Sequence, residues 1–126
     1  MSEPESSLEV AHRLIASIEA GDIDIARDCF ADNVVIWHNN DGIEQTYDEN
    51  SRTLSWVIHT VSDRRYEEIR RQETSMGFVQ QHVLRGTTRS GKLLELPACI
   101  VCTVVAGKIT RLDEYLDSAQ TTVLRS

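Results

Sequence analysis

Four histidines are the side chains of this sequence whose ordinary pKa lies closest to neutral pH, and they are the first candidates for proton-transfer chemistry. They stand at positions His12, His38, His59 and His82. They are too dispersed to suggest a shared metal site, and the sequence has no phosphate-binding loop or dinucleotide-binding motif. We therefore expect neither a metal nor a cofactor, so any reaction would be carried by the side chains themselves.

A second chemical motif is the C-x-x-C formed by Cys99 and Cys102. A redox pair of this kind needs its thiols at a helix N-terminus, which lowers the pKa of the first sulfur. Here the surrounding residues, 96–105, are typical of a strand, in which positions i and i+3 point to opposite faces. With Cys29 the number of cysteines is odd, so we expect three reduced thiols in a cytoplasmic protein.

The composition indicates a globular protein. Its 126 residues suffice for one domain, taken as residues 1–126, and 40% of them are apolar against 26% charged. No apolar run approaches the ~20 residues that span a bilayer, so no membrane partner is expected. The acidic N-terminus does not fit a signal peptide. A net charge of −7 argues against a nucleic-acid partner, because surfaces that bind phosphate are basic.

Helical patterns occupy the first half of the chain. Ser6 and Glu9 have the spacing of a capping box, and apolar residues then recur at helical period until Gly21. A short second helix is expected after Asp22, which suits an N-cap position. A third helix is expected from about Asp48, with an apolar stripe on one side.

Strand patterns make up the rest of the chain. An early strand is expected between the second and third helices at residues 34–38, which are β-branched and aromatic. Four more strands, joined by short turns, are expected at residues 66–74, 78–85, 93–105 and 109–117. Helices followed by strands predict an α+β fold, with three N-terminal helices packed on a curved antiparallel sheet. We expect this arrangement to form a cone with one apolar pocket.

Four short motifs add a family resemblance to this prediction. They lie at residues 19–22, 30–33, 107–110 and 114–117. Over residues 8–119 the sequence resembles the SnoaL-like branch of the nuclear transport factor 2-like superfamily. The resemblance implies the cone fold and a small, largely apolar organic ligand. It leaves the reaction open, because the superfamily includes isomerases, dehydratases, cyclases, epoxide hydrolases and non-catalytic modules.

Ketosteroid isomerase is one member that can be compared position by position. Its mechanism uses a carboxylate base and an oxyanion hole made of a tyrosine and a protonated aspartate. The resemblance places His38 at the base position, where it could still move a proton. Leu14 and Cys99 fall at the two donor positions and supply no strong hydrogen bond, so steroid isomerisation is not expected.

Limonene epoxide hydrolase is a second member for comparison. It positions a water with a tyrosine, an asparagine and an aspartate, and an aspartate–arginine pair completes the proton relay. The resemblance places Trp37, Asn39 and Asp117 near the first three positions. Gln80 and His82 stand where the charged pair belongs. The relay is therefore incomplete, although Asn39 and Asp117 could still hold a water.

SnoaL-like cyclases carry an acid–base residue at the end of the last strand, where this sequence has Asp117. Burial in an apolar cone raises the pKa of a carboxylate, which suits a general acid or base. The resemblance implies a cofactor-independent lyase, isomerase, cyclase or hydrolase in which Asp117 exchanges protons with His82. The alternative is a binding or association module whose cone holds an apolar ligand without a reaction.

Strand alternation assigns the other side chains of the expected pocket. Its wall would consist of Trp37, Phe78 and Tyr115, and its polar groups would be Asn39, Gln80, His82 and Asp117. Apolar residues occur on both faces of the expected strands, above all at residues 93–105. A sheet with one solvated face alternates more cleanly, so this pattern suggests a homodimer formed through the sheet.

Overall fold

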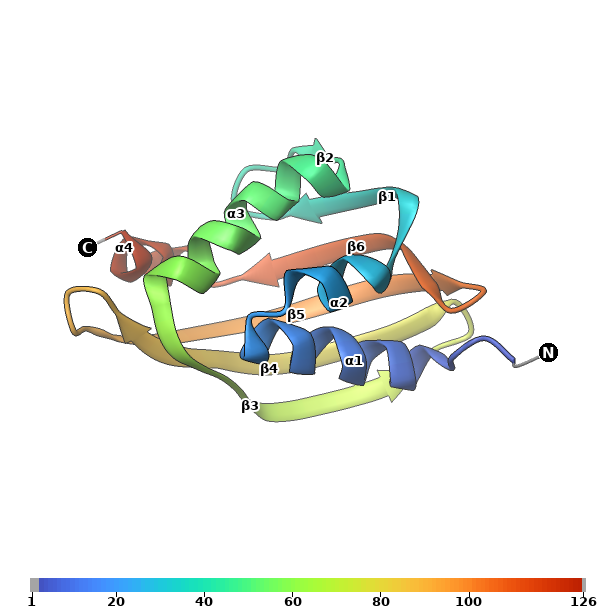
Figure 1. The fold of residues 1–126 in the computed structure, drawn as a ribbon, viewed down its shortest axis with the longest axis horizontal. Helices are drawn as coiled ribbons and strands as arrows, with labels where there is room; N and C mark the ends of the chain where they lie inside the picture. Colours follow the sequence, from blue (N-terminus) through green and yellow to red (C-terminus); the bar gives the residue numbers. More distant parts are fainter. Residues whose placement is uncertain (1–2, 126) are drawn as a thin grey trace.

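The structure of the protein, a computed structural model, describes residues 3–125 (Figure 1). The helices are α1 Ser7–Ala20, α2 Ile23–Asp28, α3 Tyr47–Thr60 and α4 Thr121–Leu124, with a short 3-10 helix, η1, at Ser118–Gln120. The strands are β1 Phe30–His38, β2 Glu44–Gln45, β3 Val61–Glu73, β4 Gly77–Thr88, β5 Leu93–Val105 and β6 Lys108–Leu116. None of the helices in this range is both long and apolar enough to cross a membrane.

The strands form a single sheet in the order β2-β1-β6-β5-β4-β3. The four long strands from β3 to β6 are antiparallel neighbours in chain order, as expected of a meander. Strand β1 pairs with β6 in parallel, with Ile36 opposite Leu112 and His38 opposite Glu114. The sheet is therefore mixed rather than wholly antiparallel, and the early strand lies beside the last one.

Helices α1, α2 and α3 lie on the same face of the sheet, which confirms the expected α+β arrangement (Figure 1). Ser6 and Glu9 form the predicted capping box at the start of α1. Asp22 caps α2, also as predicted. A second capping box, between Thr46 and Glu49, starts α3. We call the face covered by these helices the inner face and the opposite one the outer face.

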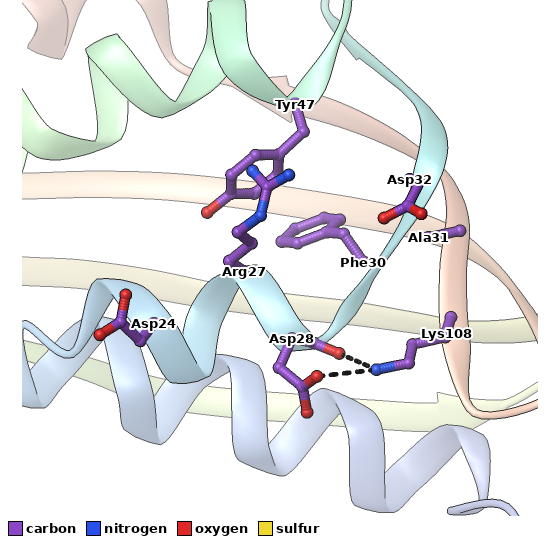
Figure 2. Close-up of a pocket in the computed structure, with 8 residues that line it drawn as sticks. All are labelled: Asp24, Arg27, Asp28, Phe30, Ala31, Asp32, Tyr47 and Lys108. Carbon is purple, nitrogen blue, oxygen red and sulfur yellow. Dashed lines mark hydrogen bonds and ion pairs between the residues drawn. The ribbon is translucent and has the colours of Figure 1, made fainter.

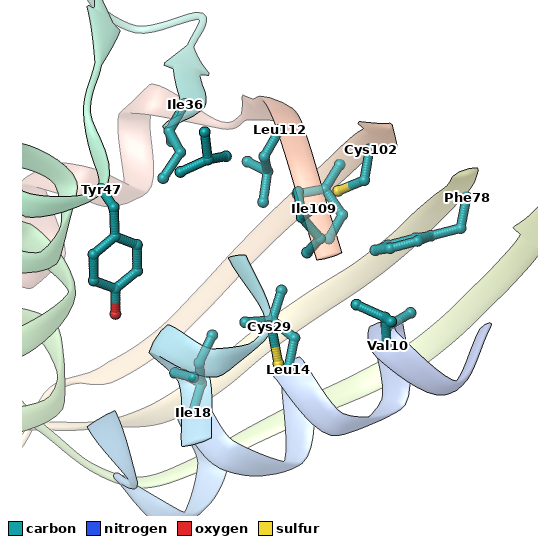
Figure 3. Packing of buried hydrophobic residues seen from close by; sticks show 14 residues of the cluster. Val10, Leu14, Ile18, Cys29, Ile36, Tyr47, Phe78, Cys102, Ile109 and Leu112 are labelled. Carbon is teal, nitrogen blue, oxygen red and sulfur yellow. The ribbon is translucent and has the colours of Figure 1, made fainter. Parts of the chain in front are cut away.

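Two apolar clusters lie on the inner face. The larger cluster packs α1, α2 and the start of α3 against β1, β4, β5 and β6 (Figure 3). Its members include Leu14, Ile18, Ile36, Phe78, Cys102 and Leu112. The smaller cluster lies toward the C-terminal helix and comprises Val61, Leu84, Leu94, Leu96 and Leu124. Side chains between the two clusters therefore face the helices without belonging to either cluster.

Edge strand β3 is bent by two irregularities in its pairing with β4. The register shifts within residues 62–65 and again within residues 67–70. Asp63 and Glu68, one in each shift, both have a φ of 55°. Extra residues of this kind increase the local twist of a strand, and so curve the sheet around the helices.

Arg64, in the first of these shifts, ties the sheet to the ends of two helices. Its guanidinium donates to the carbonyls of Ile18 and Glu19 at the end of α1. It also donates to those of Ile58 and Val61 at the end of α3. The last carbonyls of a helix have no partner within the helix, so one side chain satisfies both ends.

The C-x-x-C pair lies in β5 and its two thiols are on opposite faces of the sheet, as strand geometry predicts. Cys102 belongs to the larger apolar cluster on the inner face. Cys99 is opposite Tyr115 of β6 and lies three positions before Cys102 in β5, so its side chain points outward. Cys29, Cys99 and Cys102 are all free thiols.

Candidate functional site

A band of polar side chains crosses the inner face between the two apolar clusters. Gln80 and His82 supply it from β4, and Glu114 from β6. His38 ends β1 on the same face, and Arg71 reaches it from β3. We call these five residues the polar band.

Four members of the polar band form one row across the sheet. In the strand register His38 is opposite Glu114, and Glu114 is opposite Ile100 of β5. Ile100 is in turn opposite Gln80, which is opposite Arg71. Directly opposed residues share a face, so the register itself brings these side chains together.

His38 and Glu114 form a half-buried ion pair at one end of this row. Nε2 of His38 lies 3.0 Å from Oε1 of Glu114, and their side chains are 17% and 22% exposed. Burial alone lowers the pKa of His38, but the hydrogen bond to Glu114 and its negative charge outweigh burial, so the pKa is raised. The imidazole therefore stays protonated to a higher pH than it would in water.

Gln80 and His82 are 0% and 5% exposed. Nε of Arg71 donates to Oε1 of Gln80 at 2.7 Å, and Nε2 of Gln80 lies 2.8 Å from Nδ1 of His82. The ring of Tyr66 packs edge-on against His82, with 4.8 Å between ring centroids. Burial lowers the pKa of His82, and Arg71 lowers it further against an opposing effect of Glu114. His82 is thus a neutral imidazole at physiological pH.

Among the two histidines and Glu114 of the polar band, three polar atoms make no hydrogen bond or ion pair with any residue of the described range 3–125. They are Nδ1 of His38, Oε2 of Glu114 and Nε2 of His82. A base, an acid or a hydrogen-bond donor needs such a free atom to reach a bound molecule. Within the same range no group of three or more His, Cys, Asp or Glu side chains is arranged to hold a metal ion.

Helix α3 covers the inner face less tightly than α1. Helix α1 buries six of its residues, whereas in α3 only Tyr47 of the first turn is buried. Leu54 and Val57 pack against the two apolar clusters and still keep part of their surface exposed. Helix α3 therefore packs on the inner face through fewer fully buried side chains than α1 does.

Arg71 and Glu114 are the two members of the polar band that the sequence did not predict as site residues. Glu114 is the more informative of the two. Alternation along β6 places it with Leu112 and Leu116, which read as core residues. The signal that could have found it is a charged residue between two leucines on a face that packs against helices. Such a residue is buried only where it has a partner, and His38 is that partner here.

Trp37 and Tyr115, expected as pocket wall, lie on the outer face. Their rings contact each other edge-on, with centroids 5.2 Å apart. Trp37 alternates with the inward-facing His38, and Tyr115 alternates with the inward-facing Glu114, so both rings point away from the helices. Phe78 does share the inner face, but it is fully buried in the larger apolar cluster.

Asn39 has a structural contact at the edge of the site. Its side-chain oxygen accepts a hydrogen bond from the backbone N–H of Leu116 at 2.9 Å. The backbone N–H of Asn39 donates to the backbone carbonyl of Glu114. These two bonds join the end of β1 to the end of β6. They hold the strands that carry His38 and Glu114 in register.

Asp117 is exposed and caps the 3-10 helix η1, where its Oδ1 accepts from the N–H of Ala119 at 3.1 Å. His82 is opposite Ala98, which is opposite Leu116, so these three residues share the inner face. Asp117 follows Leu116 and falls on the other face. The structure therefore does not bring Asp117 to the face of His82, and the carboxylate that shares this face is Glu114.

A shallow hollow of about 370 Å³ on the outer face is lined by several residues that the sequence analysis singled out. Tyr115, Asp117 and Cys99 line it, and His82 borders it from within the sheet. The imidazole of His82 is bonded to Gln80 on the inner face, so its ring nitrogens are not shared with this hollow. The apolar pocket expected inside the cone stays a prediction.

Another hollow, of about 330 Å³, lies between α2, the start of α3 and the first residues of β1 and β6 (Figure 2). Its cations already have partners. Lys108 Nζ is 3.0 Å from Oδ1 of Asp28, and the guanidinium of Arg27 lies 4.7 Å from the centre of the Tyr47 ring. The hollow is thus a charged surface feature whose groups largely satisfy one another.

Solved structures share this fold over nearly its whole length. A candidate polyketide cyclase from Pseudomonas putida is 17% identical, with a TM-score of 0.81 over 95% of this chain and 98% of that one. IdmH, a candidate polyketide cyclase from Streptomyces antibioticus, is 15% identical, with a TM-score of 0.79 over 96% and 99%. A candidate isomerase from Bacillus subtilis is 9% identical, with a TM-score of 0.81 over 94% and 91%. At such identities the likeness shows the fold alone.

Among curated proteins, none matches the sequence. The family described as the SnoaL-like domain matches residues 11–112. That range runs from α1 into β6 and contains four of the five residues of the polar band, with Glu114 two positions beyond it. The resemblance drawn from the short motifs is therefore confirmed. The chain belongs to the SnoaL-like domain family, with the cone fold of nuclear transport factor 2-like proteins.

Proposed function

We propose that this protein binds a small organic molecule with a carbonyl group over the polar band and transfers a proton at the carbon beside that carbonyl. The observation that carries this proposal is the half-buried pair of His38 and Glu114, on the same face as the neutral His82. Acid–base side chains can remove such a proton, and a hydrogen-bond donor can stabilise the charge that develops on the oxygen. This step needs no cofactor.

Glu114 is the proposed base. One of its oxygens is held by His38 at 3.0 Å, and the other has no partner within the described chain. The fixed oxygen orients the carboxylate, so the free oxygen can take the proton from carbon and later return it. The positive charge on His38 stabilises the carboxylate before it takes the proton and again after it has returned it.

We place the proposed ligand site over the inner face of β5. Glu114 and Gln80 are two strands apart, which corresponds to about 10 Å between their backbones. Ile100 lies between them, and the small side chain of Ala98 lies beside His82. The apolar clusters on both sides of the polar band would contact the rest of the molecule, so we expect that part to be apolar.

The similar structures support this chemistry at the level of reaction class. Two of them are candidate polyketide cyclases and one is a candidate isomerase. Reactions of both classes can begin with loss of a proton beside a carbonyl group. A non-catalytic binding module is the alternative, in which the same face would hold a ligand without proton exchange.

Deuterium exchange into an apolar ketone such as 1-indanone tests the proposal directly. In heavy water the wild-type protein should accelerate exchange at the carbon beside the carbonyl, followed by proton NMR. Glu114→Gln should slow the catalysed exchange about 100-fold or more, because it removes the base but keeps the shape. Asp117→Asn is the matched control, since it changes a carboxylate on the outer face three residues away and should leave the rate unchanged.

Two outcomes would contradict this assignment. If Asp117→Asn abolishes exchange while Glu114→Gln does not, the outer hollow is the reactive site. If the wild type binds the ketone, seen as perturbed resonances of inner-face residues, yet does not accelerate exchange, the binding-module alternative is favoured.

We also propose that a second copy of the chain packs on the outer face to form a homodimer. Trp37, Val101 and Tyr115 lie together there, and Val101 and Tyr115 are 40% and 50% exposed. Exposed apolar residues clustered on one face of a sheet are typical of an interface. The three free thiols support a reducing, cytoplasmic location for the protein.

A further inference from the structure

The hydrogen bonds around His82 have a direction that is fixed by chemistry. Arg71 lies at one end of the chain of bonds, and its guanidinium has only donors and no acceptor. The atom of Gln80 that faces Arg71 at 2.7 Å must therefore be the amide oxygen. The amide nitrogen is then left for His82, 2.8 Å away. The order of donation runs from Arg71 to Gln80 to His82.

This direction decides which nitrogen of His82 carries the proton. An amide NH₂ donates, so Nδ1 of His82 must accept and cannot itself carry a hydrogen. A neutral imidazole has one N–H, which leaves it on Nε2. Burial and the charge of Arg71, which lower the pKa of His82 against the effect of Glu114, favour that neutral form. The ring of Tyr66, packed edge-on at 4.8 Å, hinders rotation of the imidazole.

We propose that Arg71, acting through Gln80, is a positioning residue that fixes His82 as the neutral Nε2–H tautomer. His82 then acts on a bound molecule as a hydrogen-bond donor and not as a base. The ligand class this selects is a molecule with an acceptor oxygen, above all a carbonyl whose oxygen gains negative charge during the reaction. This last statement rests on the proposed function, whereas the tautomer does not.

The separation of roles follows from the same geometry. Glu114, held by His38, is the only carboxylate in the row, and it stands two strands away from His82. One side of the ligand would therefore face a base and the other a neutral donor. A neutral donor does not have to lose a proton when the oxygen gains charge, so no second proton has to move in that step.

The tautomer can be measured without any ligand. The experiment is long-range proton–nitrogen NMR of the full chain labelled with ¹⁵N. It is run at about pH 7.5, because a buried imidazole of this kind is neutral there. The His82 signals are assigned by their loss in His82→Asn. In the wild type we expect Nδ1 to be unprotonated and Nε2 to be protonated. In Gln80→Glu the carboxylate would accept from both neighbours, so the proton should move to Nδ1. Gln81→Glu, one residue away on the outer face, should leave the signals in place.

Arg71→Met provides a second variant if Gln80→Glu does not fold. Without the guanidinium the amide of Gln80 can turn over, so a mixture of the two tautomers is expected. A protonated Nδ1 of His82 in the wild type overturns the inference. So does a folded Arg71 or Gln80 variant whose His82 signals are the same as those of the wild type. Failure of the wild type to exchange the ketone would instead overturn the proposed function and leave the tautomer result standing.

Discussion

Replacing Glu114 with glutamine should lower the free energy of unfolding by an amount that depends on pH. The substitution removes the ion pair with His38, in which Nε2 of His38 lies 3.0 Å from Oε1 of Glu114. The side chains of His38 and Glu114 are 17% and 22% exposed. Hydrogen bonds to charged groups contribute about 1.5–3 kcal/mol when buried, and exposed ion pairs about 1 kcal/mol or less. A half-buried pair lies between these limits. We expect a loss of about 1–2 kcal/mol in the free energy of unfolding under conditions where His38 is protonated.

The direction of the pH dependence follows from the raised pKa of His38. A group whose pKa is higher in the folded than in the unfolded state adds its full stabilisation below the unfolded value. That contribution disappears as the pH rises through the folded value. The loss caused by Glu114→Gln should therefore be largest below the ordinary histidine pKa of 6.5 and smaller at alkaline pH.

A double-mutant cycle isolates this interaction from other effects of the substitutions. Urea unfolding of the wild type, Glu114→Gln, His38→Gln and the double variant at about pH 6 and about pH 9 gives the coupling energy at each pH. The coupling should be favourable at the lower pH and should fall at the higher one, where only a neutral N–H faces the carboxylate. A coupling that is absent at low pH, or that grows as the pH rises, would refute the ion pair described here.

Three further predictions concern the structure around the site. Arg64→Met should lower the free energy of unfolding by about 2–4 kcal/mol, measured in urea, because it removes the side-chain donor of four helix-end carbonyls, of which that of Ile18 keeps the N–H of Gly21; a loss under 1 kcal/mol would contradict the contact. Tyr47→Phe should stabilise the protein by about 1 kcal/mol and raise its melting temperature by roughly 4 °C, because the buried Tyr47 hydroxyl has no partner in the described range; a lower melting temperature would show that the hydroxyl is satisfied. Val101→Glu should weaken the proposed dimer about 100-fold in sedimentation experiments, with Ile25→Glu on α2 as control; a dimer that survives it does not use this face.

Local patterns in the sequence predicted most of the fold. Capping at Ser6 and Asp22 was visible because the bonds involved span only three residues. The long strands were visible because their periodicity repeats over many residues. The parallel pairing of β1 with β6 had no local signal, because its partners are more than 70 residues apart in sequence. The two-residue strand β2 and the helix α4 were also missed, since each is too short to show a period.

Alternation along single strands predicted only part of the candidate site, for a reason that lies in strand geometry. Alternation correctly grouped Gln80 with His82, and separately grouped Trp37 with Asn39. It does not say which face of one strand meets which face of the next, because that depends on register and curvature. Aromatic residues suggested the outer face of β1 for the pocket, whereas the proposed site lies on the inner face. The aliphatic Ile36, which packs with the core, marks the inner face and brings His38 with it.

The polar band interrupts what could otherwise be one continuous apolar core, and this argues for a role beyond folding. On β4, Phe78 belongs to the larger cluster and Leu84 to the smaller one, with Gln80 and His82 buried between them. Leucine at both intervening positions would join the two clusters and would leave no polar group to satisfy. Burying an amide or an imidazole costs about 1–3 kcal/mol unless every polar atom finds a partner. Here Nε2 of His82 finds none within residues 3–125. Nε2 of His82 is not among the fully buried unpaired side-chain atoms of this range, so it still reaches solvent. A ligand oxygen can take the place of water as its acceptor, which is the property of a binding site.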